Sequence, residues 1–173
     1  KVREFGRQLR TRFPRSRHHW ELRFQLGQAD LHLGEFALAK KELTAVLGQR
    51  TNDEIFKAGW FDETWVLLAE SHLRLKDYDA LVATVADFRR ARPKSSVLHK
   101  ADEILGRGLI KKPRPDFDNA RAAFRRVINS TSGRKTQSAA RSHLQLADSF
   151  FLQKNYREAK KEFLAVHILY KFP

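Results

Sequence analysis

The chain has 173 residues, of which 42% are hydrophobic, and it contains no cysteine. Disulfide bonds and thiolate chemistry are therefore excluded, and the apolar content is sufficient for a single domain, predicted over residues 1–173. No apolar run approaches the roughly 18 residues that a membrane-spanning helix requires, so no transmembrane segment is expected. The 34 basic and 20 acidic residues give a net charge of +14.

Positive charge is concentrated at the start of the chain, where residues 1–17 contain 7 basic residues and 1 acidic residue. The helical spacing of Phe5, Leu9 and Phe13 before Pro14 predicts the tail of a preceding repeat in this segment. Phe13-Pro14 and Phe172-Pro173 fall at equivalent repeat ends. We therefore expect the chain to be a fragment of a longer array.

Four helix pairs are predicted to follow, over residues 18–50, 53–93, 95–130 and 135–173. The second helix of each pair carries an aromatic residue, an Ala or Leu three positions later and another apolar residue seven positions later. These triplets are Phe36-Ala39-Leu43, Tyr78-Leu81-Val85, Phe117-Ala120-Phe124 and Tyr156-Ala159-Phe163, with aromatics 42, 39 and 39 residues apart. The spacing places each triplet on one face of a helix that begins near its aromatic residue, and a fixed period of this length indicates stacked helix pairs.

The first helix of each pair contains Leu followed by a small residue, as Leu26-Gly27, Leu68-Ala69, Leu105-Gly106 and Leu146-Ala147. This motif lies ten residues before the aromatic residue in three units and twelve residues before Phe117 in the third. The turn that carries Pro113 and Pro115 is therefore expected to be two residues longer than the others.

This pattern resembles the tetratricopeptide repeat, in which the first helix carries an aromatic residue and Leu-Gly/Ala, and the second carries Tyr/Phe, Ala, Phe and Ala before a closing Pro. The second unit matches best, through Trp65, Leu68-Ala69, Tyr78 and Pro93. The chain departs from the family in two ways. Its period is 39 to 42 residues, whereas that of the family is 34 residues. The second departure concerns the early aromatic position of the first helix. Only Trp65 fills that position, and the other units have Arg23, Asp102 and His143 there.

The resemblance implies an all-α fold, an α-α superhelix (solenoid) of about four helix pairs plus a leading helix. Longer units of this type resemble those of bacterial envelope proteins, such as outer-membrane-assembly lipoproteins and the Tol-Pal accessory protein. That similarity favours the periplasm or envelope over the cytoplasm.

In the family, the first helices line a concave face that binds a peptide or a partner domain. The matching positions here are Phe24, Gln28 and Leu31; Val66, Glu70 and Leu73; Glu103, Arg107 and Ile110; and Leu144, Asp148 and Phe151. Three first helices repeat an apolar pair seven residues apart: Phe24 and Leu31, Val66 and Leu73, and Leu144 and Phe151. A peptide groove requires at least three of these six side chains to be solvent-accessible on one surface. The alternative is that they complete the packing between helices. The carboxylate clamp of chaperone-binding members is not expected, because the clamp Asn is absent.

A second candidate surface is basic, and such a surface can attract nucleic acid or an anionic lipid surface. Its residues are Arg12, Arg15, Arg17, Arg89, Arg90, Arg92, Lys111 and Lys112. Base stacking also requires exposed aromatics among the basic residues, and only Phe5, Phe13 and Trp20 are placed for that role. The alternative is an ordinary solvated face, which the matching positions of Lys40-Lys41, Arg121 and Lys160-Lys161 on the second helices suggest.

Enzyme chemistry finds little support in the sequence. The seven histidines are scattered, and no pair has the spacing of a zinc hydrolase motif. Gly106-Arg107-Gly108 is too short for a phosphate loop. We expect no catalytic residues, metal or cofactor. The leading hypothesis is a protein-interaction scaffold; the alternatives are a basic nucleic-acid or anionic-surface binder and, third, a non-catalytic accessory domain of a larger enzyme.

Overall fold

The computed structural model describes residues 6, 8, 11–12, 16 and 18–170, and these residues form helices and connections without a strand. The helices are α2 (His19–His32), α3 (Phe36–Leu47), α4 (Asp53–Phe56), α5 (Phe61–Arg74), α6 (Tyr78–Ala91), α7 (Leu98–Lys111), α8 (Phe117–Asn129), α9 (Gln137–Leu152) and α10 (Tyr156–Leu169). The all-α prediction is confirmed, and the four second helices begin at the predicted aromatics. The predictions that involve Phe5, Leu9, Phe13-Pro14 and Phe172-Pro173 lie outside the described residues.

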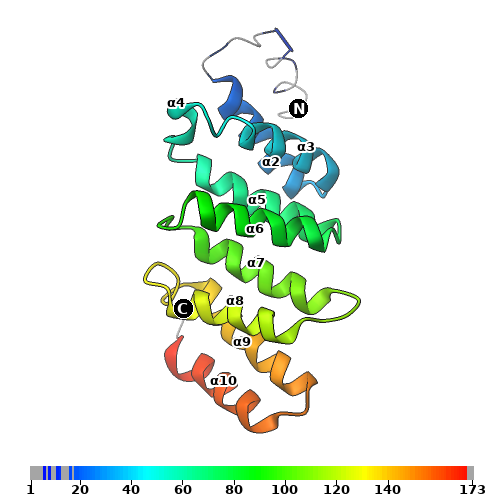
Figure 1. The fold of residues 1–173 in the computed structure, drawn as a ribbon, viewed down its shortest axis with the longest axis vertical. Coiled ribbons are helices and arrows are strands. Elements are labelled where there is room, and N and C mark those ends of the chain that lie inside the picture. The colour runs from blue at the N-terminus through cyan, green and yellow to red at the C-terminus, as the bar shows by residue number, and fades with distance from the viewer. Residues whose placement is uncertain (1–5, 7, 9–10, 13–15, 17, 171–173) are drawn as a thin grey trace. The chain divides into compact units, whose positions relative to one another are not determined.

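The chain divides into two compact units, residues 1–88 and residues 89–173. In the first unit α2 packs against α3, and α5 packs against both. In the second unit α7 packs against α8, α9 packs against both, and α10 packs against α9 (Figure 1). The pairing within each unit is consistent with an α-α superhelix. A single domain over residues 1–173 stays a prediction.

The turns inside the helix pairs share one backbone feature. Gly34, Lys76 and Lys154 each lie two residues before a second helix, and their φ angles are 79°, 59° and 61°. A left-handed residue at this place ends the first helix and reverses the chain, and glycine adopts it at the lowest cost. Capping then starts two of the second helices as expected: Asp116 accepts from the N–H of Asn119, and Asn155 accepts from the N–H of Glu158.

Small residues in the first helices allow the two helices of a pair to approach closely. A Cβ atom added to Gly27 would lie 2.8 Å from Cγ of Leu43 on α3. A Cβ atom on Gly106 would overlap the ring of Phe124 on α8. The equivalent Ala69 and Ala147 are fully buried. The Leu-Gly/Ala motif therefore marks the contact line between paired helices.

Trp65 fills the core of the second pair. Its ring stacks on Phe88 of α6 at a centroid distance of 5.0 Å and meets Phe61 edge-on at 5.2 Å. The side chain is 1% exposed. The expectation that Trp65 is buried between helices is confirmed.

The other three pairs use ionic contacts at the position of Trp65. Nε of Arg23 donates to Glu42 at 2.7 Å, and Nδ1 of His143 lies 2.6 Å from Oε2 of Glu162. Asp102 accepts from Nε of Arg126 at 3.1 Å and also from Arg89. The contacts of Arg23, Asp102 and His143 with Glu42, Arg126 and Glu162 join the first helix of each pair to the second, and Arg89 reaches Asp102 from α6. Charged or polar contacts therefore replace the aromatic residue in these three pairs, and the carboxylate of Asp102 is not buried alone.

Candidate interaction surface

Exposed apolar side chains gather on the last helix pair. Eleven large apolar side chains are exposed in the described part of the chain, and eight of them belong to α9 and α10. These eight are Leu144, Phe151, Leu152, Tyr156, Phe163, Leu164, Ile168 and Leu169. A soluble protein usually hides such a concentration of apolar area, so a patch of this kind marks a candidate interaction site.

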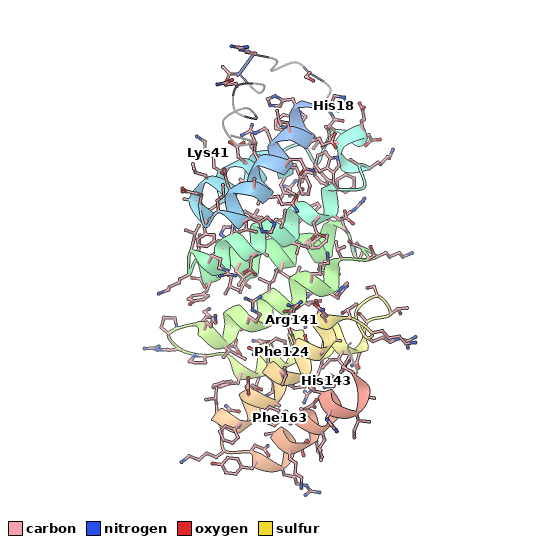
Figure 2. The ribbon with its side chains drawn as sticks, turned by 180° about the vertical axis from the view of Figure 1, so that it is seen from behind. His18, Lys41, Phe124, Arg141, His143 and Phe163 are labelled. Carbon is pink, nitrogen blue, oxygen red and sulfur yellow. The ribbon has the colours of Figure 1, made fainter. Side chains whose placement is uncertain are left out.

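Three aromatic residues form the centre of this surface. Phe151, near the end of α9, meets Tyr156 at the start of α10 edge-on, with ring centroids 5.4 Å apart. Phe163, labelled in Figure 2, follows Tyr156 by two helical turns and therefore shares its face of α10. The three side chains are 55%, 58% and 39% exposed. We call Phe151, Tyr156, Phe163 and Leu164 the aromatic surface.

The equivalent side chains in the other pairs are buried. Leu43 on α3 and Phe124 on α8 occupy the position of Phe163, and both are fully buried. Within their own units, α5 packs against α3 and α9 packs against α8. No described helix packs against α10 in this way. The position of Phe163 is therefore enclosed in the α3 and α8 pairs and open in α10, whereas the position of Leu164 is exposed in all three helices.

The sequence interpretation assigned Tyr156 and Phe163 to the core stripe and missed this surface. A signal was nevertheless present eight residues after each second-helix aromatic, where the four units have Thr44, Ala86, Arg125 and Leu164. Twelve residues after the aromatic, the four units have Gly48, Arg90, Asn129 and Ile168. Of the four second helices, only α10 has a large apolar residue at both positions. The additional apolar residues extend the core stripe of α10 onto its outer side.

The predicted groove residues are only partly exposed. Leu144, Asp148 and Phe151 of α9 are exposed, whereas Gln28, Leu31, Glu70, Arg107 and Ile110 are half-buried. Phe24, Val66 and Leu73 are 5% exposed and Glu103 is also buried, so these four positions cannot contact a partner.

Local packing explains this burial. The ring of Trp60, which precedes α5, stacks on Phe24 at 5.2 Å. Val66 and Leu73 lie on α5, which packs against both helices of the preceding pair. Glu103 contacts Nε of Arg141 at 3.3 Å. The predicted groove residues that are fully exposed therefore all lie on α9.

A cation four residues after the aromatic of a second helix reaches the following first helix. Nζ of Lys40 on α3 donates to Asp77, three residues after the end of α5, at 2.8 Å. Arg121 on α8 donates to Oγ of Ser149 on α9 at 3.0 Å, and its guanidinium lies 4.3 Å from the ring centre of Phe150. Arg121 is 9% exposed. The expectation of a solvated outer face is therefore wrong for Arg121, while Lys41, Lys160 and Lys161 are exposed.

The predicted basic surface is divided among different environments. Arg12, Arg90 and Lys111 are exposed, and Arg92 and Lys112 are half-buried. Arg89 binds the buried carboxylate of Asp102. Arg15 and Arg17 lie outside the described residues. One of the described basic residues, Arg89, thus neutralises a buried acid. Trp20, the described aromatic residue near the basic segment, is half-buried against His19.

A cleft of about 430 Å³ lies in the second unit, between residues 93–99 and the turn at residues 130–132. His99 lines it, and its Nδ1 lies 2.8 Å from the carbonyl oxygen of Ser96 and 3.4 Å from Oγ of Ser132. A carbonyl oxygen can only accept, so Nδ1 carries the proton. That nitrogen cannot act as a base toward Ser132, and this pair lacks the arrangement of a nucleophile and its base.

Two further histidines lie beside carboxylates. His72 lies 3.3 Å from Asp77, and His143 contacts Glu162. Arg141 and His143 both lie on α9 (Figure 2). Among the residues that the structure describes, no group of three or more His, Asp or Glu side chains is arranged to hold a metal ion.

Fold and surface together define an all-helical protein of paired helices with one exposed apolar helix face. No protein-family model matches the sequence, and no curated protein matches it. None of the described helices is long and apolar enough to cross a membrane.

Proposed function

We propose that this chain is a tetratricopeptide-like interaction scaffold that binds a partner protein through the aromatic surface. The observation that carries the proposal is the contrast between α10 and the equivalent helices α3 and α8. The position of Phe163 is fully buried in those two helices, as Leu43 and Phe124, and is 39% exposed in α10. Burial of exposed aromatic and aliphatic area is the main source of affinity in protein interfaces, and aromatic residues are enriched at their centres.

The helix pairs support the family assignment within this proposal. The second helices begin at the residues that the repeat pattern predicts. The Leu-Gly/Ala motif lies at the contact between paired helices, as in the tetratricopeptide repeat. The resemblance to long-period envelope proteins leads us to propose the bacterial envelope as the location.

Quantitative affinity capture tests the proposal. The chain is immobilised, and proteins bound from an extract of the source organism are compared between the original sequence and Phe151→Asp. A carboxylate in the centre of an apolar contact opposes binding because it loses hydration without a partner. We expect Phe151→Asp to lose one or more specific proteins that a matched control, Leu33→Asp, retains. Leu33 is an exposed apolar residue at the end of α2, in the first unit.

Two results would contradict the proposal. The first is a set of captured proteins that is unchanged by Phe151→Asp. The second is capture that disappears after nuclease treatment and at high salt, because binding to phosphate weakens steeply with salt. That result would favour the basic nucleic-acid binder instead.

A further inference from the structure

The structure describes two helices that lie on the equivalent of the aromatic surface, and these define the shape of its occupant. Helix α5 covers α3, and helix α9 covers α8. Each covering helix is amphipathic and buries apolar residues, among them Val66, Leu68 and Leu73 on α5 and Leu146 and Phe150 on α9. The aromatic residue and the apolar residue seven positions later recur on α10 as Tyr156 and Phe163. The occupant of this face is therefore an amphipathic helix.

The position of Lys160 defines the polar chemistry of the occupant. It lies four residues after Tyr156, as Lys40 follows Phe36 and Arg121 follows Phe117. Lys40 binds the carboxylate of Asp77, three residues after the end of α5, and Arg121 binds oxygens near the end of α9. Lys160 is exposed between Tyr156 and Phe163. An oxygen acceptor at the C-terminal end of the bound helix would complete the same contact.

Charge around α10 favours an acidic partner. Residues 153–169 contain the basic residues Lys154, Arg157, Lys160 and Lys161, and the acidic residues Glu158 and Glu162. Both acids already have cationic or histidine partners, because Glu158 pairs with Lys161 and Glu162 with His143. Lys154, Arg157 and Lys160 remain, and they outnumber Asp148, the exposed acid that lies one turn before Phe151 on α9. Opposite charge around an interface accelerates association and selects the partner.

The same charges disfavour a second copy of this chain as the occupant. Two α10 helices packed face to face would bring two sets of these cations together. The helices that cover such a face, α5 and α9, are already packed against α3 and α8 within their own units.

Together with the proposed function, on which this inference rests, we infer that the aromatic surface binds an amphipathic helix of a partner protein. That helix lies on α10 as α5 lies on α3. It carries an apolar stripe against Tyr156 and Phe163 and a carboxylate near its C-terminal end that pairs with Lys160.

A peptide of residues 60–77 is a suitable probe, because it contains α5 and its terminal Asp77. It has the acidic residues Asp62, Glu63, Glu70 and Asp77 and the basic residues Arg74 and Lys76. Its acidic balance complements α10. The fluorescently labelled peptide is titrated with the full 173-residue chain, and binding is followed by anisotropy. We expect saturable binding that weakens about tenfold or more with Phe163→Asp and with Lys160→Glu.

A charge exchange separates the specific contact from general attraction. The peptide with Asp77→Lys should bind the Lys160→Glu chain more tightly than it binds the original chain. Lys41→Glu is the matched control, because Lys41 is an exposed lysine of α3 (Figure 2) and should leave affinity unchanged. Circular dichroism of each variant confirms that the helices remain folded.

Several results would overturn the inference. They are the absence of saturable binding, equal binding by the Phe163→Asp chain, or no rescue by the exchanged charges. A dimer of the original chain that Phe163→Asp dissociates would instead identify a second copy as the occupant. None of these results alone removes the proposed function, since capture of a protein that depends on Phe151 would still support a scaffold with another type of partner.

Discussion

At the scale of single residues, Trp65 allows the most direct test of core packing. The ring stacks on Phe88, meets Phe61 edge-on and has almost no contact with solvent. Trp65→Ala should lower the free energy of unfolding by about 3 to 5 kcal/mol, because it removes a large apolar side chain and leaves a cavity. Urea denaturation measures this change. A loss below about 1 kcal/mol would show that the ring is not part of a packed core.

Two lysines in left-handed turns provide a prediction of the opposite sign. Lys76 and Lys154 are exposed and have φ angles near 60°, which glycine adopts without steric cost. Replacing either lysine by glycine should raise the free energy of unfolding by about 0.5 to 1 kcal/mol. Gly34→Ala, at φ 79°, should lower it by a similar amount. A destabilising effect of both lysine substitutions would contradict the turn geometry.

His72 gives the first unit a defined response to pH. Its pKa is held below the usual 6.5 by burial and by Lys40, although Asp77 acts in the opposite direction. The unfolded chain therefore binds a proton at higher pH than the folded chain does. The stability associated with neutral His72 is complete above pH 6.5 and falls as the pH decreases toward the lowered pKa.

The substitution His72→Gln should remove this part of the pH dependence. Unfolding midpoints measured from neutral to mildly acidic pH should decrease less for His72→Gln than for the original chain. His32→Gln, which changes an exposed histidine at the end of α2, serves as the control. An identical pH profile for the original chain and His72→Gln would show that another group is responsible.

At the scale of helices, the sequence predicted the elements but not what covers them. The second helices could be located because each has a periodic apolar stripe and most have a polar residue able to cap the first turn, both of which are local signals. Helix α4 was missed because it has four residues and depends on the Asn52 cap, which accepts from the N–H groups of Glu54 and Ile55. Four residues are too few to show the apolar periodicity of a helix.

The candidate site was harder to predict than the helices, because burial depends on neighbours distant in sequence. Phe24 has the same position in its helix as Leu144 has in α9, yet Trp60 covers it. Arg121 resembles any exposed cation of an amphipathic helix, yet it is buried against Ser149 and Phe150. Phe163 matches Phe124 in sequence position and differs only in lacking a covering helix.

The close contact of paired helices can be tested at Gly106. Alanine normally stabilises a helix by about 1 kcal/mol relative to glycine, but the added methyl group would overlap the fully buried ring of Phe124. Overpacking should outweigh the gain in helix propensity, and we expect a net loss of about 1 to 3 kcal/mol in denaturant titrations. The control is Gly59→Ala, where no heavy atom lies within 4 Å of the new methyl group. Stabilisation by Gly106→Ala would contradict the close approach of α7 and α8.

At the scale of the whole molecule, the central claim is that a helical-repeat chain presents one uncovered helix face to a partner protein. The helices of each pair are joined at the early aromatic position, by Trp65 in the second pair and by charged or polar contacts in the other three. Among the described second helices, α10 carries its apolar stripe, extended by Leu164 and Ile168, into solvent. Binding through this surface would require little rearrangement. Its residues lie on α9 and α10, and these two helices already pack against each other, with Ala159 of α10 buried.

Site-specific photo-cross-linking from this surface tests the claim most directly. A photoreactive phenylalanine analogue replaces Tyr156 in the chain produced in its source organism, and a second variant carries the analogue at Leu33 as the control. The account predicts a discrete cross-link to another polypeptide from position 156 and none from position 33. Cross-links of equal intensity from both positions, or the absence of a protein cross-link from position 156, would contradict it.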